Sequence, residues 1–253
     1  MKLYDSGGVS GARAAEPLTA KNSAIRRGGE RGYADYGWTD VHLTFSFAEY
    51  YELRWMGYRS LRVLVENTIQ PKGIFSTHPH SDMEIVTYVA DGTLAHKDSM
   101  GNEGMIRAGE FQRMSAGTGV WHSEGNASET KTEHNIQIWI LPAERTIEPG
   151  YEQKGFAPEG RRGKLRLAVS PDGRDGSVSI NQDAEIWTAL LSPGDEATHE
   201  LRDGRGAWVH VVSGEVELNG TRLSAGDGAA VEHVGLLELR ALADSDVLLF
   251  DLA

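Results

Sequence analysis

Residues 71–92 read PKGIFSTHPHSDMEIVTYVADG. Within this segment, the run from Ile85 to Val89 has the composition of a β-strand, and the turn signal Asp91-Gly92 ends it. Comparable runs, in which apolar residues alternate with more polar ones, occupy residues 41–47, 61–65, 136–140, 165–169 and 208–212. This alternation is typical of strands with one buried face. Short strands separated by glycine-rich turns predict an all-β barrel or sandwich.

Parts of the first half of the chain recur in the second half. The matching pairs are residues 71–78 with 193–199, 86–92 with 209–214, and 106–110 with 223–227. Because the three matches keep the same order and similar spacing, duplication explains them better than chance reuse of common turns. We therefore expect two β-barrel (jelly-roll) domains, over residues 31–150 and 151–253. Residues 1–30 show little periodicity, and we expect them to form a loose extension.

The composition limits the kinds of function. The chain has 253 residues, a net charge of −12 and no cysteine. An acidic surface repels phosphate backbones, so we expect no direct binding of nucleic acid. Without cysteine there are no disulfides or thiolate ligands, so His, carboxylate or water must hold any metal. We expect a cytoplasmic protein, because the sequence shows neither the apolar region of a signal peptide nor a run of membrane-spanning length.

Two short segments carry residues suited to metal binding. His78 and His80 lie two positions apart, as do His122 and Glu124. Side chains two positions apart in a strand point to the same face, so the four groups meet at one point if the two strands are neighbours. Neutral imidazoles and one carboxylate suit a divalent first-row metal and leave open positions for a substrate or oxygen. Pro79 cannot donate a ladder hydrogen bond, which predicts an edge strand or a bulge.

Other candidates have weaker support. Glu84 either faces the metal or, as we prefer, accepts a hydrogen bond that orients an imidazole. In the second repeat His199 matches His78, but Leu201 replaces the second histidine. A half-site of His199 and His233 is the alternative to our expectation that the second barrel supports the first without metal. Structural or surface roles are expected for the remaining candidates, which are His42, His96, His134, His210 and the basic linker residues 161–164.

Several of these segments together resemble pirin-like proteins of the cupin superfamily. They are residues 78–80, 83–89, 96–102 and 114–124, with further similarity at 32–38, 44–48, 138–142 and 151–153. The similarity is greatest to the bacterial branch, some of whose members degrade quercetin, and it is specific over residues 30–156. The resemblance implies a bicupin fold, with a metal in the N-terminal cupin and a degenerate C-terminal cupin.

The resemblance also implies a ligand set and a reaction. Three histidines and one glutamate are the family's ligands, and they fall on His78, His80, His122 and Glu124. Fe(II) is the expected metal, although related proteins accept other divalent ions. The first hypothesis is a dioxygenase that cleaves quercetin or a related flavonol or enol with O2. In that reaction Glu124 takes the proton of the 3-hydroxyl, whose pKa the metal lowers, and carbon monoxide leaves.

The second hypothesis is a metal-dependent redox sensor that binds another protein, for which the acidic surface would suit a basic partner. The third hypothesis is that the natural substrate is another small aromatic molecule and that activity on quercetin is incidental. We favour the enzyme because the similarity is greatest to the bacterial branch, although fold alone does not determine function. Phe75, Met114 and Trp121 are candidates for the pocket wall from their proximity in the sequence alone.

Overall fold

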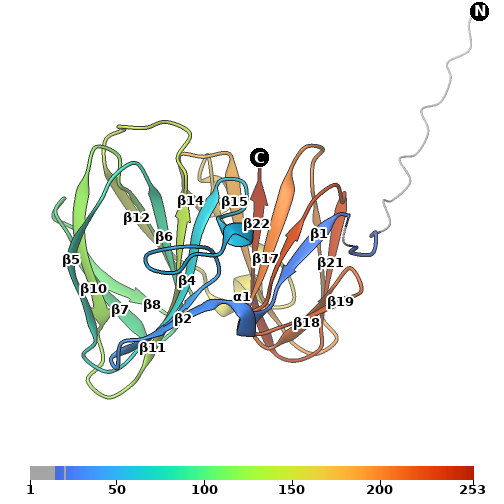
Figure 1. Cartoon of the computed structure of the whole chain (residues 1–253), viewed down its shortest axis with the longest axis horizontal. Coiled ribbons are helices and arrows are strands. Elements are labelled where there is room, and N and C mark those ends of the chain that lie inside the picture. Colours follow the sequence, from blue (N-terminus) through green and yellow to red (C-terminus); the bar gives the residue numbers. More distant parts are fainter. Residues whose placement is uncertain (1–14, 20) are drawn as a thin grey trace, which may run out of the picture.

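The structure is a computed structural model, and it describes residues 15–19 and 21–253. Nearly all regular structure in these residues is β-strand, and it forms four sheets in two pairs that lie side by side along the long axis (Figure 1). Short helical turns interrupt the strands; they are η1 (Gly28–Glu30), η2 (Leu53–Trp55), α1 (Pro158–Arg161) and η3 (Arg174–Gly176). The predicted all-β bicupin fold is confirmed.

The first barrel consists of a seven-stranded sheet facing a four-stranded sheet. The large sheet contains, in spatial order, β12 (Gly150–Gly155), β9 (Glu110–Ser115), β6 (Glu84–Asp91), β11 (Glu133–Ile140), β4 (Leu61–Ile69), β3 (Thr39–Leu43) and β2 (Gly32–Asp35). The small sheet contains β5 (Ile74–His80), β10 (Val120–Asn126), β7 (Thr93–Asp98) and β8 (Glu103–Arg107). All strand pairs in this barrel are antiparallel.

The second barrel repeats this arrangement. Its large sheet contains β1 (Ser23–Arg26), β20 (Gly228–Val231), β17 (Gly206–Ser213), β22 (Ser245–Leu252), β15 (Ala184–Leu191), β13 (Arg166–Ser170) and β14 (Val178–Ser179). Its small sheet contains β16 (Glu196–Glu200), β21 (Leu236–Ala241), β18 (Glu215–Leu218) and β19 (Thr221–Ser224). The order β20-β17-β22-β15 matches β9-β6-β11-β4 of the first barrel, and the two small sheets also match strand by strand. A duplicated unit has this property.

The N-terminal segment is not a loose extension over the described residues. Strand β1 pairs with β20, with Ile25 opposite Ala229, so the start of the chain completes the sheet of the second barrel (Figure 1). Ala24 and Ile25 pack against different apolar cores, one on each face of that sheet. The strand has only four residues, too few to show periodicity. The expectation for residues 1–14 lies outside the described part of the chain.

The sheet pairing also shows where the first barrel ends. Strand β12 pairs with β9 along its whole length, so residues 151–155 belong to the sheet of the first barrel rather than to the second. The α1 turn follows, and Arg161 within it is buried, with its guanidinium 2.6 Å from the Tyr88 hydroxyl. The expectation of a solvated linker at residues 161–164 is therefore wrong for Arg161, whereas Arg162 is exposed.

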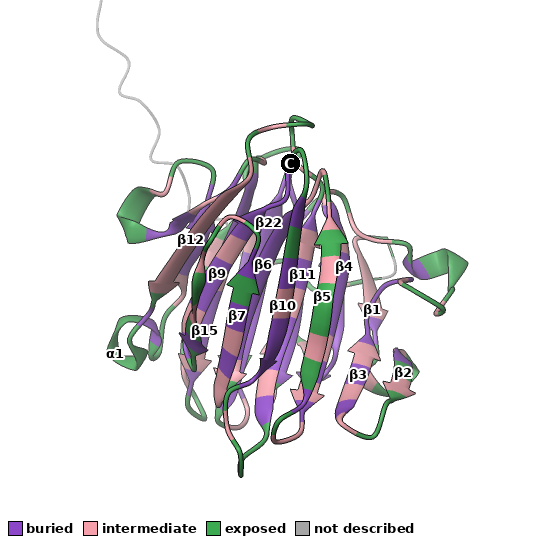
Figure 2. Ribbon diagram, turned by 90° about the vertical axis from the view of Figure 1, so that its left-hand side faces the viewer, coloured by how far each residue is buried: buried purple, intermediate pink, exposed green. Residues whose placement is uncertain are grey.

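The two large sheets pack against each other through a shared apolar core. This core joins residues of the first barrel, such as Tyr88 and Ile138, to residues of the second, such as Trp208 and Phe250. Strands in the middle of these sheets are therefore covered on both faces. All eight residues of β22 and the first six of β6 are buried, and Figure 2 shows both strands almost wholly in the buried colour. Two-sided burial explains why successive residues of these strands are buried and mostly apolar, which one buried face would not require.

Candidate metal centre

The predicted ligands lie on two neighbouring strands. Strands β5 and β10 pair antiparallel, and His78 is directly opposite His122. Directly opposed residues share a face, so His78, His80 and His122 all point into the first barrel. Strand β5 is the edge of its sheet, as Pro79 predicted, and most of its residues are exposed or half-buried. A register shift between His122 and Glu124 places Glu124 opposite Phe75.

The three imidazoles converge. One ring nitrogen from each of His78, His80 and His122 lies within 4.8 Å of the other two. The Nδ1 of His78 donates to the Ser76 carbonyl oxygen at 2.8 Å, which leaves its Nε2 as the free ligand atom. The Nε2 atoms of His80 and His122 are 2.9 Å apart. Two lone pairs at that distance repel unless a proton or a cation lies between them.

The protonation state of His80 and His122 favours a metal ion. Burial, reinforced by the neighbouring imidazole of His78, lowers the pKa of His80 to about 4. Burial and the nearby histidines lower the pKa of His122 to about 2. Both rings are therefore neutral at pH 7, and the neutral imidazole is the form that binds metal. Three imidazole nitrogen donors at this spacing fit a divalent first-row ion.

Glu124 lies beside the imidazoles but outside the group whose ligand atoms converge. Its carboxylate accepts a hydrogen bond from the Gln137 amide nitrogen at 2.7 Å and one from the Thr87 hydroxyl at 3.4 Å. The side chain is buried, and burial raises the pKa of the carboxyl to about 7. The structure thus brings three of the four predicted ligands together and holds the fourth on donors from the opposite sheet.

A cavity of about 330 Å³ opens at these residues. Its polar end contains His78, His80, Glu124 and Gln137. Its remaining walls are largely apolar or aromatic and come from β2, β3, β4, β5, β11 and the loop after β3; they are Ala34, Tyr36, Val41, Leu43, Phe47, Ala48, Val65, Phe75 and Trp139, with Asn67 and Pro79. A mostly apolar cavity with a few polar groups at one end is the usual form of a site for a small organic ligand.

The sequence predicted only part of this wall. Phe75 lines the cavity as expected, whereas Met114 is buried in a separate apolar cluster and Trp121 is 53% exposed. Trp139 and Gln137 were missed, although they lie two positions apart on β11 and their shared face could have been inferred from strand alternation. Tyr36 carries no comparable signal, because it lies in a turn outside the regular strands. Phe47 shares the predicted alternation of residues 41–47 with Val41 and Leu43, although β3 itself ends at Leu43.

Glu84 does not orient an imidazole. Its carboxylate accepts hydrogen bonds from the Ser115 hydroxyl at 2.9 Å and from the backbone and side chain of Asn181, on the side of β6 that faces the second barrel. The parity with His80 is lost because a turn through Asp82, with φ of 50°, separates β5 from β6. His96, by contrast, is fully buried inside the first barrel, with its ring 5.4 Å from that of His122.

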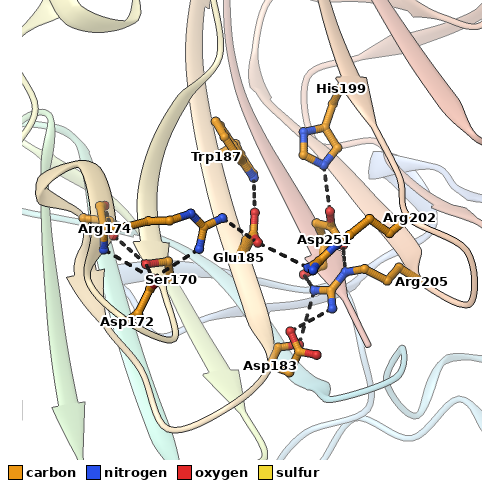
Figure 3. A network of polar contacts seen from close by, with 11 residues as sticks. Ser170, Asp172, Arg174, Asp183, Glu185, Trp187, His199, Arg202, Arg205 and Asp251 are labelled. Carbon is orange, nitrogen blue, oxygen red and sulfur yellow. Dashed lines mark hydrogen bonds and ion pairs between the residues drawn. The ribbon is translucent and has the colours of Figure 1, made fainter. Parts of the chain in front are cut away.

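The corresponding end of the second barrel carries an ionic network instead of clustered imidazoles (Figure 3). The Nε2 of His199 is 2.8 Å from Asp251, whose other oxygen accepts a hydrogen bond from Arg205. His233 lines a different cavity, with Arg59 and Leu201, so the two residues of the alternative half-site do not come together. Behind the network, apolar side chains fill the barrel.

Comparison with known proteins identifies the family. The sequence model of the pirin family matches residues 25–140, and that of the quercetinase C-terminal cupin domain matches residues 167–252. The chain is 47% identical to a quercetin 2,3-dioxygenase of Escherichia coli strain K12, over 90% of this chain and 97% of that protein. It is 40% identical to a pirin-like protein of Caulobacter vibrioides, over 88% and 96% of the two chains.

A solved structure agrees with these matches. The crystal structure of the bacterial pirin YhhW from Escherichia coli in complex with nickel(II) superposes with a TM-score of 0.86, at 46% identity, over 91% of this chain and 98% of that one. The chain therefore belongs to the pirin family of bicupin proteins, in the bacterial branch with quercetin 2,3-dioxygenase-like members. The expected enzyme class is confirmed at the level of this branch, and the three-histidine group agrees with a single divalent metal.

Among the described residues, no helix has both the length and the apolar character needed to cross a lipid bilayer.

Proposed function

We propose that this protein is a metal-dependent dioxygenase that cleaves quercetin or a related flavonol or enol with O2. The observation that carries the proposal is a group of three converging imidazoles beside a buried carboxylate, of which His78, His80 and Glu124 line a largely apolar cavity. We assign His78, His80, His122 and Glu124 as the metal site and Fe(II) as the ion. The quercetin 2,3-dioxygenase name of the Escherichia coli relative supports the choice of substrate class.

The metal would act as a Lewis acid that lowers the pKa of a bound substrate hydroxyl. The protein's own side chains remove the substrate proton and exclude water. Glu124, with a pKa raised to about 7, has a proton affinity suited to removing the proton from the substrate's 3-hydroxyl near neutral pH. The aromatic wall formed by Phe47, Phe75 and Trp139 packs against the planar rings and excludes water from the reacting carbon atoms.

One assay tests the proposal. The metal-free protein is loaded with Fe(II) without oxygen, quercetin and O2 are added, and the loss of flavonol absorbance is followed together with the release of carbon monoxide. We expect one carbon monoxide per flavonol consumed. Stoichiometric metal with no turnover above free iron would reject the reaction and favour the redox-sensor hypothesis. His78→Ala is the control for the site, since a variant that still binds metal tightly would contradict the ligand assignment.

The role of Glu124 has its own test. Glu124→Gln keeps the size of the side chain but removes the base, so we expect turnover to fall at least about 100-fold. Metal content, measured by elemental analysis, should fall much less, because the three imidazoles remain. An equal loss of metal and of turnover would show that Glu124 acts as a ligand only.

A further inference from the structure

Three residues form a hydrogen-bonded relay across the first barrel. Trp139 and Gln137 lie two positions apart on β11 of the large sheet, and Glu124 lies on β10 of the small sheet. The indole nitrogen of Trp139 donates to the side-chain oxygen of Gln137 at 3.1 Å. The amide nitrogen of Gln137 donates to Oε2 of Glu124 at 2.7 Å. The relay therefore connects the aromatic wall of the cavity to the carboxylate at its polar end.

The chemistry of the indole fixes the direction of this relay. An indole N–H can only donate a hydrogen bond, so the Gln137 atom that faces Trp139 must be the amide oxygen. The amide nitrogen then necessarily faces Glu124. A flipped amide would place an N–H₂ group against the indole N–H and an oxygen against the carboxylate, so both contacts would become repulsive. Trp139 is itself held by edge-to-face contacts with His80 and Phe47, at ring distances of 4.9 and 4.8 Å.

The relay also gives Glu124 a stable position outside the group of converging ligand atoms. Its side chain is only 3% exposed, and a buried carboxylate without donors is strongly destabilised. Gln137 and Thr87 supply donors to the two carboxylate oxygens and so replace the contacts that a metal ion would provide. We propose that Gln137, oriented by Trp139, holds Glu124 against the large sheet and thereby controls whether this carboxylate serves as a ligand or as a base.

This inference rests on the proposed function for its catalytic consequence, but the positioning role can be measured by metal binding alone. If Gln137 competes with the metal for Glu124, removing its amide should strengthen metal binding, whereas loss of a merely structural residue would weaken it. Gln137→Met keeps the length of the side chain and removes both donor and acceptor. We expect nickel(II) to bind roughly tenfold more tightly to this variant by isothermal titration calorimetry at pH 8.5, where the carboxyl is ionised.

Three further variants complete the experiment. Trp139→Phe keeps an aromatic ring but frees the Gln137 amide to rotate. We therefore expect nickel(II) to bind more tightly to this variant than to the wild type, by a smaller factor than in Gln137→Met. In a Glu124→Gln background, Gln137→Met should have no effect, because the competing group is gone. Trp187→Phe is the matched control, because the Trp187 indole donates to Glu185 at the same 3.1 Å in the second barrel (Figure 3). This contact involves none of the residues assigned to the metal site. Nickel affinity should be unchanged.

The possible results separate this inference from the proposed function. Weaker or unchanged nickel binding in Gln137→Met, or tighter binding that persists in the Glu124→Gln background, would overturn the role assigned to Gln137. Absence of quercetin turnover would reject the reaction and leave the nickel result intact. If turnover is present, Gln137→Met should lower kcat more than it changes KM, since it removes the contact that frees the base and leaves the aromatic wall of Phe47, Phe75 and Trp139 unchanged.

Discussion

The imidazoles of His80 and His122 are neutral because the barrel excludes water around them. The pKa of His122 is lowered to about 2 and that of His80 to about 4, against an ordinary value of about 6.5. As the pH falls below about 6.5, the unfolded chain takes up protons on these rings, whereas the folded, metal-free protein does not until the pH reaches the lowered values. The stability of the metal-free protein should therefore decrease as the pH falls from about 6.5 to 4.

This linkage can be measured by urea unfolding at a series of pH values. Because His122 is buried, it should give the free energy of unfolding a slope against pH that approaches about 1.4 kcal/mol per pH unit. The half-exposed His80 should contribute a smaller slope, because solvent screens its charge. His122→Gln should remove most of the His122 slope. His233→Gln, on the second barrel, is the control. Identical slopes for wild type and His122→Gln would contradict the assignment of a neutral buried imidazole.

At the residue scale, the sequence allowed the three imidazoles to be identified because strand alternation is a local rule. Alternation places the two side chains of each pair, His78 with His80 and His122 with Glu124, on one face of their strand. The two pairs face each other only if β5 and β10 are neighbours, and the structure shows that they are. Glu84 was placed wrongly because the same rule does not extend across a turn. The Gln137–Glu124 contact joins two sheets, and no local pattern predicts which side chains meet across a barrel.

Among the elements, the turn before β10 sets the position of His122. Gly117 has φ of +44°, and a Cβ atom there would lie 2.1 Å from the carbonyl oxygen of Ile147. This clash is with backbone, so the turn would have to move. Gly104 on β8 offers a matched site, because a Cβ atom there meets nothing within 4 Å.

We expect Gly117→Ala to destabilise the protein by at least about 2 kcal/mol, from the left-handed backbone and the clash together. It should also reduce the nickel content, since β10 begins three residues later and carries His122. Gly104→Ala should change the stability by less than about 0.5 kcal/mol. It should leave the nickel content unchanged within experimental error. Thermal unfolding and elemental analysis of the two variants make the comparison. A stable Gly117→Ala protein with full metal content would refute the role of this turn.

Element boundaries were predicted best where turn signals flank a long apolar run, as at β6. They were predicted worst at β1 and β12, whose membership in a sheet depends on partners far away in the chain. The alternation rule also suggested one buried face for strands such as β17, which is buried on both faces. That second face is covered by the other barrel, and a single strand holds no information about which neighbour covers it.

At the scale of the whole molecule, the two barrels are joined by buried polar groups as well as by the apolar core. Tyr88 of the first barrel donates a hydrogen bond to Asp246 of the second, and Arg161 lies 3.7 Å from the same carboxylate. Burial raises the pKa of Asp246, so the guanidinium is needed to keep this carboxylate charged inside the interface.

Arg161→Met should therefore destabilise the protein by about 3–5 kcal/mol, because it leaves a buried carboxylate without its cation. Arg162→Met is the control, since the neighbouring side chain is exposed and should change stability by less than about 0.5 kcal/mol. Chemical denaturation followed by tryptophan fluorescence measures both variants. Equal stability of the two would mean that the Asp246 carboxyl is neutral in the folded protein.

The pairing of β1 with β20 has a consequence for synthesis on the ribosome. Residues 23–26 are made early, yet their hydrogen-bonding partners follow about 200 residues later. During translation the growing chain must keep this short segment unengaged while the first barrel forms, and the second barrel acquires its last strand from the beginning of the polypeptide. The order of closure thus runs opposite to the order of synthesis, and the second barrel cannot be completed from its own half of the gene alone.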